Sequence, residues 1–214
     1  IPFGFLANSS VSDAEGNLLF YSNGCFVANR QHQIMPHGDS LSFGLYYTNA
    51  CVDGNLGYPA HQGILTLPWP GDPERYAILH YRTGETGNGI HAELLYSLVD
   101  MSLENGLGDV TSKNQLLAQA FYAATLTAVR HGNGRDWWIV APIYHTKLYY
   151  TFLFSPEGFS GPYLHSFGQI WTFFQGGSQD CFSTDGSKFI RMAPGLWGCQ
   201  ITDFDRCTGQ FGNV

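Results

Sequence analysis

Two pairs of acidic residues have a spacing that could bring carboxylates together. Asp203 and Asp205 in TDFDR are two residues apart, as are Asp13 and Glu15 in SDAEGN. Each pair would share one face of a strand, and paired carboxylates carry out glycoside hydrolysis. Both pairs, however, stand where an apolar run meets a turn, and Asp there accepts backbone N–H groups and shapes the turn. Turn formation is the favoured interpretation, and weak calcium binding by loop oxygens is a third alternative.

The eight histidines are the next candidates, as metal ligands or as acid–base groups. His32 and His37 stand five residues apart beside Asp39 in RQHQIMPHGD, a stretch typical of a polar loop. Three others lie singly in or beside predicted strands and turns: His80, His131 and His145. Isolated histidines in aromatic-rich sheets more often form structural hydrogen bonds than bind a metal, and no H-E-x-x-H motif is present. Apart from weakly bound calcium, the sequence predicts no metal and no cofactor.

Motifs for other chemistries are missing or incomplete. A G-x-S-x-G nucleophile elbow is absent. The glycine-rich stretches GNGIH and GGSQD lack the lysine of a phosphate-binding loop and precede no predicted helix. The aromatic groups WTFF (171–174) and Trp137-Trp138 could form a platform for carbohydrate, although core packing is the favoured interpretation. We therefore assign no catalytic residue.

The five cysteines, at positions 25, 51, 181, 199 and 207, match no zinc-binding spacing. Cys199 and Cys207 are close enough in sequence to bridge within a hairpin. A bond between Cys25 and Cys51 would close a loop of about 26 residues and leave Cys181 unpaired. Five free, buried thiols are the alternative. The residues alone leave these arrangements open.

The composition is typical of a β-rich globular protein. Only 13% of the residues are charged, whereas 15% are aromatic, and 26 glycines and 10 prolines supply many turns. The formal net charge is −7 and lysine and arginine form no cluster, so a polyanion would be repelled and nucleic acid is not an expected partner. No run of about 18 apolar residues occurs, so no membrane span is predicted.

Short apolar runs separated by turn residues predict β-strands along most of the chain. In the first hairpin, LLFYS (18–22) and CFVANR (25–30) flank Asn23-Gly24, a strong hairpin signal because both residue types can adopt positive φ. Three later groups repeat a strand, a polar turn, a strand, a link and a third strand. Their strands are 63–69, 76–82 and 93–101, then 126–131, 137–143 and 147–154, then 180–183, 188–192 and 198–204. The one candidate helix is NQLLAQAFYA (114–123).

These repeated groups predict an all-β fold of the β-propeller class. Their middle strands start near residues 76, 137 and 188, and such small sheets must stack because none can bury both faces alone. We expect about four to five antiparallel blades in a partial or incomplete ring. Residues 1–214 would form a single β-propeller-like domain, a fragment of a longer chain. A plain β-sandwich is the rival fold, but it does not account for the recurring order of turns.

Several stretches resemble a signature of large secreted proteins of Bacteroidetes. SVSDAEGNLLFYSNGCFVANRQHQIMPHGDSL (10–41) is similar to the family pattern sDxnGnLLFYtnG followed by iMpnGd.L. Four further matches follow in the family's order and cover most of the chain: LLYSLVDMSLENGLGDVTSKNQLL, LTAVRHGNGRDWWIV, FSTDGSKFI and ITDFDRCTGQF. The loop TNACVDGNLGYPAHQG (48–63) departs from this pattern and resembles only one branch of the family.

The resemblance implies cargo of the type IX secretion system, with an N-terminal propeller-like region of WD40 or YVTN character. PKD or Ig-like modules and a C-terminal sorting domain would follow in the full-length protein. Export implies an extracellular or cell-surface location, where disulfides persist, and on that basis we predict the bonds Cys25–Cys51 and Cys199–Cys207. Asp39-Ser40-Leu41 resembles the O-glycosylation sites of such proteins, which makes Ser40 a candidate for glycosylation.

The expected function is that of a secreted or cell-surface, non-enzymatic propeller module for adhesion, binding or extracellular scaffolding. Its partner would be a protein or a glycan at the cell surface, or another copy of itself. Two alternatives stay open. One is an extracellular carbohydrate-active enzyme, a glycoside hydrolase or lyase, whose carboxylates would converge on the central channel or a rim. The other is a structural subunit of an extracellular filament or sheath.

Overall fold

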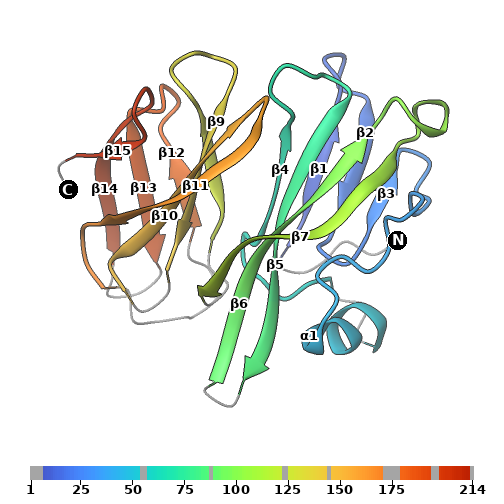
Figure 1. Ribbon diagram of the computed structural model, residues 1–214, viewed down its shortest axis with the longest axis horizontal. Coiled ribbons are helices and arrows are strands. Elements are labelled where there is room, and N and C mark those ends of the chain that lie inside the picture. Colours follow the sequence, from blue (N-terminus) through green and yellow to red (C-terminus); the bar gives the residue numbers. More distant parts are fainter. Residues whose placement is uncertain are drawn as a thin grey trace. The chain divides into compact units, whose positions relative to one another are not determined.

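The computed structural model describes residues 7–53, 57–86, 89–121, 125–143, 146–170, 179–193 and 198–212. The chain divides into two compact units, unit 1 (residues 1–123) and unit 2 (residues 124–214). Within the described residues the strands form four antiparallel sheets, two in each unit (Figure 1). The fold is all-β and of the β-propeller class, with these sheets as its blades, which confirms the predicted fold class. The assignment of the whole chain to a single domain stays a prediction.

Unit 1 contains a three-stranded and a four-stranded sheet. The first sheet consists of β1 (Ser9–Ser12), β2 (Leu18–Ser22) and β3 (Val27–Asn29), in that order. The second consists of β4 (Ile64–Pro68), β5 (Arg75–Thr86), β6 (Gly89–Asp100) and β7 (Asp109–Phe121). The predicted Asn23-Gly24 turn joins β2 to β3. Gly24 has a φ of +80°, and a Cβ there would lie 2.7 Å from Cβ of Tyr58, so the turn needs glycine.

The apolar core of unit 1 lies between these two sheets. Its buried members come from both: Ala7, Phe20, Val27, Met35, Leu41, Ile64, Ile78, Val99, Met101 and Val110. Phe20 on β2 meets Tyr76 on β5 edge to face, with ring centroids 5.2 Å apart. The stacking that the sequence predicted for small sheets is therefore present in this unit.

A short helical segment, which the sequence did not predict, follows the first sheet. It comprises α1 (Leu45–Tyr47) and a π-helical turn, η1 (Thr48–Asp53). A 3₁₀ turn, η2 (Glu104–Gly106), separates β6 from β7. Cys51 in η1 forms a disulfide with Cys25, and their Cα atoms are 5.6 Å apart. The bond attaches this segment to the turn between β2 and β3.

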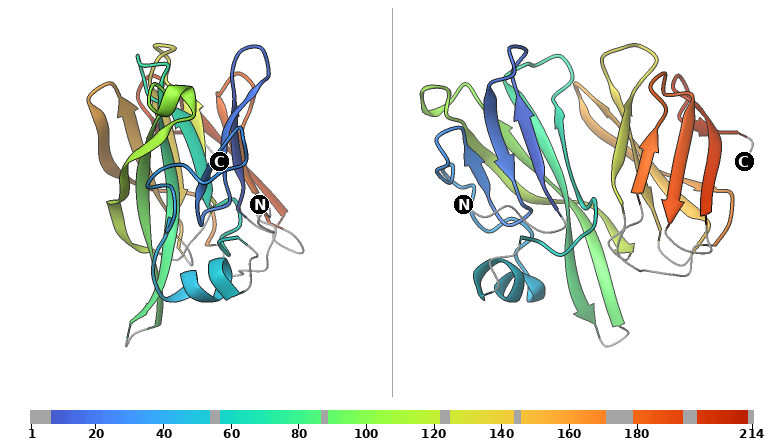
Figure 2. Two further views of the ribbon diagram at one scale, coloured as in Figure 1. Left: turned by 90° about the vertical axis from the view of Figure 1, so that its right-hand side faces the viewer. Right: turned by 180° about the vertical axis from the view of Figure 1, so that it is seen from behind.

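Unit 2 contains two four-stranded sheets, seen from behind in the right panel of Figure 2. One consists of β8 (Thr127–Arg130), β9 (Trp137–Pro142), β10 (Leu148–Ser155) and β11 (Gly158–Ser166). The other consists of β12 (Gln179–Phe182), β13 (Lys188–Ala193), β14 (Gly198–Asp205) and β15 (Gln210–Phe211). Each pairs its strands in sequence order, as expected for hairpin-connected blades.

Aromatic side chains fill the space between the sheets of unit 2. Tyr149 on β10 meets Phe189 on β13 edge to face at 5.8 Å, and Phe204 meets Phe211 at 5.0 Å. The remaining members of this packing include Val129, Trp138, Val140, Leu153, Phe167 and Phe182. The high aromatic content of the chain is thus explained by wide gaps between sheets, which large rings can fill.

The predicted helix at residues 114–123 is wrong for its described part, which belongs to β7. The pairing of β6 with β7 shifts register at several points. Such bulges move side chains out of strict alternation, so the apolar residues of the strand acquire a helix-like spacing. Asn114 has a φ of +56°, and its side chain bonds to the backbone of Ser40 and Ser42.

All strands named from the sequence are present, but each group of three gains a fourth strand. These additional strands are β7, β11 and β15. β11 was not predicted because its residues, GFSGPYLHS, combine glycine and proline with few apolar side chains. The complete blades are therefore four-stranded.

Candidate functional site

Of the acidic pair Asp13 and Glu15, Asp13 holds the turn between β1 and β2. Asp13 Oδ1 accepts hydrogen bonds from the backbone N–H groups of Asn17 at 2.7 Å and Glu15 at 3.1 Å. Its second oxygen accepts the Asn17 side-chain amide at 2.9 Å. These bonds, led by the Asn17 side chain, lower the pKa of Asp13. The turn-forming interpretation is confirmed for Asp13.

Asp203 and Asp205 have different structural roles. Asp203 forms an ion pair with Lys188 on the neighbouring strand β13. Asp205 accepts the backbone N–H of Cys207 and the hydroxyl of Thr208, both at 2.8 Å, and the first of these bonds is the main cause of its lowered pKa. Both carboxylates line one shallow pocket of about 350 Å³, but each is held by a partner of its own.

Asp185, in the turn TDGS, shows the same pattern in its strongest form. Its carboxylate accepts the hydroxyl of Ser183 at 2.6 Å and both the backbone N–H and the hydroxyl of Ser187, at 3.0 and 2.9 Å. These bonds lower the pKa of Asp185 to about 2. The acidic turns that recur along the sequence are structural joints between strands.

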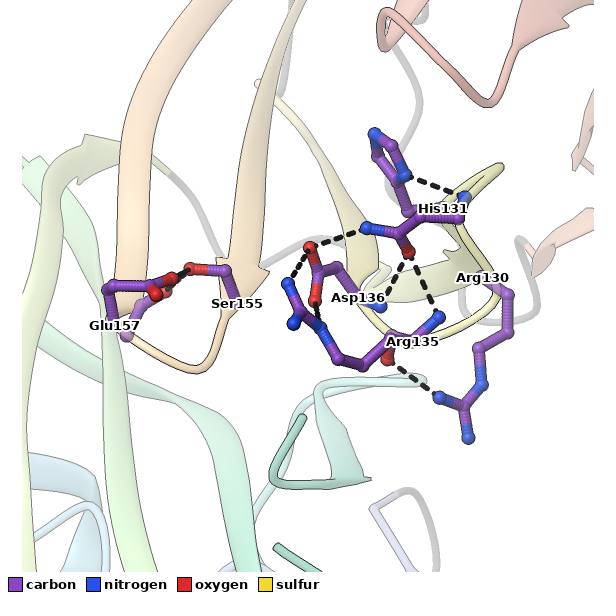
Figure 3. A network of polar contacts seen from close by, with 8 residues as sticks. Arg130, His131, Arg135, Asp136, Ser155 and Glu157 are labelled. Carbon is purple, nitrogen blue, oxygen red and sulfur yellow. Dashed lines mark hydrogen bonds and ion pairs between the residues drawn. The ribbon is translucent and has the colours of Figure 1, made fainter. Parts of the chain in front are cut away.

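The turn between β8 and β9 contains a polar network, drawn in Figure 3. Asp136 accepts bonds from the Arg135 guanidinium at 2.7 Å and from the Asn133 amide at 2.8 Å. The bond from Arg135 lowers the pKa of Asp136. His131 accepts the backbone N–H of Asn133 on Nδ1 at 3.0 Å, so its ring carries its proton on Nε2. That nitrogen donates to the carbonyl of Cys207 at 3.1 Å, so both ring nitrogens of His131 have structural roles.

His32, His37 and Asp39 do not gather into a site. His32 contacts the hydroxyl of Tyr21 at 3.3 Å, and His37 pairs with Asp109 at 2.9 Å. Asp39 pairs instead with Lys113 at 3.1 Å. Among the residues that the structure describes, no three His, Cys, Asp or Glu side chains form a group that could hold a metal ion. Weak calcium binding stays a prediction.

His80 is buried in the centre of β5 and has no access to solvent. Its Nδ1 lies 2.8 Å from the hydroxyl of Ser42, and its Nε2 lies 3.0 Å from the hydroxyl of Ser97. Burial lowers the pKa of His80 to about 3, so the ring is neutral at pH 7. It is a structural histidine. His145 lies outside the described residues.

The predicted disulfide Cys25–Cys51 is confirmed, whereas the predicted bond Cys199–Cys207 is wrong. Cys199 and Cys207 are free and exposed. Cys199 lies at the start of β14, and Cys207 lies in the turn that follows its end. A strand rises about 3.3 Å per residue, which places the two cysteines near opposite ends of an extended segment. The distance between their Cα atoms is therefore greater than the limit of about 7 Å for a disulfide. Cys181 is also free.

A buried ion pair crosses the sheet β12–β15. Asp180 on β12 faces Arg191 on β13, with Oδ1 and Nε 3.8 Å apart. Asp180 also accepts a hydrogen bond from Thr125, and Arg191 donates to the hydroxyl of Tyr149 at 3.2 Å. Burial raises the pKa of Asp180 to about 6, although Arg191 and Thr125 act in the opposite direction. No sequence motif indicated this pair.

A groove of about 330 Å³ lies between the two sheets of unit 2. One side comes from the β8–β9 turn and from β9, β10 and β11, and the other comes from the β14–β15 turn and the start of β15. Its lining is His131, Trp138, Thr151, Leu153, Tyr163, His165, Cys207, Thr208, Gly209 and Gln210. None of these lining residues is a carboxylate, a lysine or an arginine. We call this feature the Trp138 groove.

Close packing holds the two sides of the Trp138 groove together. Nε1 of Trp138 donates to the carbonyl of Arg206 at 2.9 Å, which attaches the indole to the β14–β15 turn. A Cβ on Gly132 would lie 2.5 Å from Sγ of Cys207, so the β8–β9 turn also lies against this turn. The groove is therefore formed before any ligand arrives, as is usual for binding sites.

The predicted aromatic platform is only partly found. Trp137 and Trp138 are neighbours in β9, so they point to opposite faces of the sheet. Trp138 lines the groove, whereas Trp137 lies under the guanidinium of Arg130, whose Cζ is 3.9 Å from the ring centroid. WTFF (171–174) lies outside the described residues. No local sequence pattern marks Tyr163, His165 or Gln210, because they meet only through the pairing of distant strands.

The chain was compared with known proteins by family model, by curated sequence and by solved structure, and nothing matches in any of the three comparisons. Among the described residues, none of the helices has the length and the apolar character needed to cross a membrane. The disulfide is typical of proteins that fold in an oxidising compartment.

Proposed function

We propose that this chain is a non-enzymatic binding module that works outside the cell or on its surface. The Trp138 groove carries the proposal, because it is preformed and none of its lining residues is a carboxylate. Glycoside hydrolysis by a pair of acids would need two carboxylates flanking the bond to be cleaved. Asp136 and Asp205 belong to turns that contribute residues to the groove, and their carboxylates hold these turns instead.

Two further features support an extracellular location. Cys25–Cys51 is a disulfide, and disulfides persist mainly in oxidising environments. The resemblance of the acidic-turn stretches to secreted type IX cargo points the same way. Under this proposal, the stacked sheets provide a rigid frame, and the turns at their edges present the binding surface.

The proposal can be tested by measuring adhesion and turnover together. The folded chain, labelled with a fluorophore on its amine groups, is applied to intact bacterial cells, to wells coated with fibronectin, and to beads of insoluble polysaccharide. We expect retention on at least one surface, loss of retention in Tyr163→Ala, and no release of reducing ends from the polysaccharide. Leu164→Ala, on the outward face of the same strand, should retain wild-type adhesion. Release of reducing ends that Asp203→Asn or Asp205→Asn abolishes would favour the enzyme instead.

A structural subunit of a filament or sheath is the second candidate. Met192 on β13 pairs with Cys199 on β14, and Ile201 shares their face of the sheet. Met192 is 41% exposed and Ile201 is 53% exposed, so apolar side chains meet solvent on this face. If copies assemble through it, Ile201→Lys should abolish any concentration-dependent increase in sedimentation coefficient. A wild-type chain that stays monomeric at high concentration would remove this candidate.

A further inference from the structure

The Trp138 groove has one face that is aromatic and partly exposed. The Tyr163 side chain is 46% exposed at its mouth, and its ring meets that of Trp138 at 6.3 Å with an interplanar angle of 67°. The His131 ring lies beside the same indole, with centroids 5.8 Å apart. An aromatic face carries partial negative charge, and it attracts the polarised C–H groups of a ring laid against it.

A bulge places Tyr163 over the groove. In the pairing of β10 with β11, Thr151 faces Tyr163 but Leu153 faces Ser160, so β11 carries one extra residue between these positions. Gly161 lies in this bulge with a φ of +119°, and a Cβ there would be 2.9 Å from the carbonyl oxygen of Thr151. Bulges next to binding sites commonly redirect a side chain in this way.

The opposite part of the lining is polar but uncharged. His165 contacts the hydroxyl of Thr151 through Nε2 at 2.9 Å, and burial lowers the pKa of His165, which keeps the ring neutral. In the described part of the chain, the side chains of Gln210 and Tyr163 have no protein hydrogen-bond partner. The amide of Gln210 and the hydroxyl of Tyr163 are therefore available to donate to and accept from a ligand.

The shape of the groove narrows the class of ligand. A phosphate or a carboxylate would find no cation in the lining. A flat nucleobase is bound best between parallel rings, whereas the planes of Trp138 and Tyr163 meet at 67°. The volume of about 330 Å³ lies at the lower end of the range of roughly 300–1,000 Å³ for ligand pockets. A small, uncharged ring with an apolar face and a polar rim fits these conditions.

We infer that the Trp138 groove binds an uncharged sugar ring of a glycan. The C–H face of the sugar lies against the half-exposed ring of Tyr163, which the buried Trp138 supports, and its hydroxyl groups bond to the Gln210 amide and the Tyr163 hydroxyl. This inference rests on the proposed function and specifies its partner. Trp138 is held by the carbonyl of Arg206, so the aromatic part of the site needs no rearrangement on binding.

The test is an NMR titration of the folded, isotope-labelled chain with six probes. Four are uncharged: the methyl glycosides of glucose, galactose, mannose and N-acetylglucosamine. Two are charged: glucuronic acid and glucose 6-phosphate. We expect at least one uncharged glycoside to shift the Trp138 indole N–H signal in a saturable manner. Tyr163→Ala and Gln210→Ala should each weaken the binding of this glycoside about tenfold. Neither charged probe should bind more tightly than the glycoside does.

Matched variants separate binding from folding. Leu164→Ala removes a side chain that is 58% exposed on the same strand, and Gln179→Ala removes an exposed glutamine of unit 2 outside the groove. Both should bind the glycoside like the wild type. The inference is overturned if no uncharged glycoside binds, if Tyr163→Ala binds as tightly as Leu164→Ala, or if a charged probe binds best.

The outcomes also separate this inference from the proposed function. If the chain adheres to a surface through Tyr163 but binds no glycoside, the proposed function stands and the sugar assignment fails. If a glycoside binds in the groove and is cleaved, the sugar assignment stands and the non-enzymatic function fails.

Discussion

Gly209, at the end of the β14–β15 turn, lies directly against the indole ring of Trp138. A Cβ on Gly209 would lie 2.6 Å from Cη2 of Trp138, and the φ of Gly209 is +72°. The turn and the ring can approach this closely only because position 209 has no side chain. This contact forms one side of the Trp138 groove.

Gly209→Ala should therefore be more damaging than an ordinary substitution of a turn glycine. The positive φ costs about 1–2 kcal/mol for an L-residue, and displacement of the packed ring adds about 1–3 kcal/mol. Gly134→Ala is the matched control, since Gly134 has a φ of +75° and nothing lies within 4 Å of a Cβ there. Urea unfolding followed by tryptophan fluorescence measures both. Equal losses of stability in the two variants would show that the ring contact contributes nothing.

The Cys25–Cys51 bond closes a loop with a sequence separation of 26 residues. In the chain-entropy description, such a crosslink stabilises the folded state by about 3.5 kcal/mol. The double variant Cys25→Ala/Cys51→Ala should lose approximately this free energy of unfolding, measured by urea denaturation. Cys199→Ala/Cys207→Ala should stay within about 0.5 kcal/mol of the wild type, because both of its cysteines are exposed and unpaired.

Peptide mapping without reduction should distinguish the bonded cysteines from the free ones. Iodoacetamide is expected to alkylate Cys199 and Cys207 in the native chain, because both thiols are free and exposed. Cys25 and Cys51 should appear as one crosslinked peptide. A crosslinked peptide containing Cys199 and Cys207 would contradict the placement of these residues at opposite ends of β14.

The strands were predictable because their signals are local. An apolar run and the turn beside it, such as LLFYS before Asn23-Gly24, specify a hairpin within a few residues. β7 was missed because its bulges imitate helical spacing, and the second disulfide was mispredicted for a related reason. A short sequence separation indicates proximity only across a turn, and the turn after β14 begins at Asp205, well beyond Cys199.

The Trp138 groove could not be predicted in the same way. Its lining comes from β9, β10, β11 and the β14–β15 turn. Tens of residues separate the first of these segments from the last along the sequence. The direction of Tyr163 depends on the bulge in β11, and no local pattern fixes a bulge. The sequence singled out Trp138, His131 and Cys207, but each for a separate reason and not as parts of one site.

The buried pair Asp180–Arg191 predicts an unusual dependence of stability on pH. The pKa of Asp180 in the folded chain is raised to about 6, above about 3.9 for an unfolded aspartate. The folded state therefore binds more protons between these values, and the contribution of this group to stability falls as pH rises from about 4 to about 6. Arg191→Met removes the compensating charge and should raise the pKa of Asp180 further.

Arg191→Met should consequently lose about 3–5 kcal/mol at pH 8, where Asp180 is left ionised and unpaired. The loss should be smaller at pH 5, where Asp180 takes up a proton. Urea unfolding at the two pH values measures the difference, and the double variant Asp180→Asn/Arg191→Met is the control because it has no carboxylate to titrate. A loss that is the same at both pH values would show that Asp180 does not depend on Arg191.

His80 should dominate the opposite, acid-induced loss of stability. Burial lowers its pKa in the folded chain to about 3, whereas an unfolded histidine titrates near 6.5. Below about pH 6.5, His80 binds a proton in the unfolded state but not in the folded state. The contribution of His80 is therefore complete above about pH 6.5 and is lost as pH falls towards 3, by about 2–3 kcal/mol between pH 6.5 and 4.5.

His80→Gln removes this titration while keeping a donor and an acceptor near the hydroxyls of Ser42 and Ser97. The variant should be about 1–2 kcal/mol less stable at pH 7, yet it should lose about 2–3 kcal/mol less than the wild type on acidification to pH 4.5. Titration of Asp180 is common to both chains and cancels in this difference. Leu164→Ala, at a residue that is 58% exposed and cannot titrate, should keep the wild-type acid dependence. If the stability curves of His80→Gln and the wild type run parallel from pH 7 to 4.5, His80 is protonated in the folded chain and its buried contacts with the two serines do not hold it neutral.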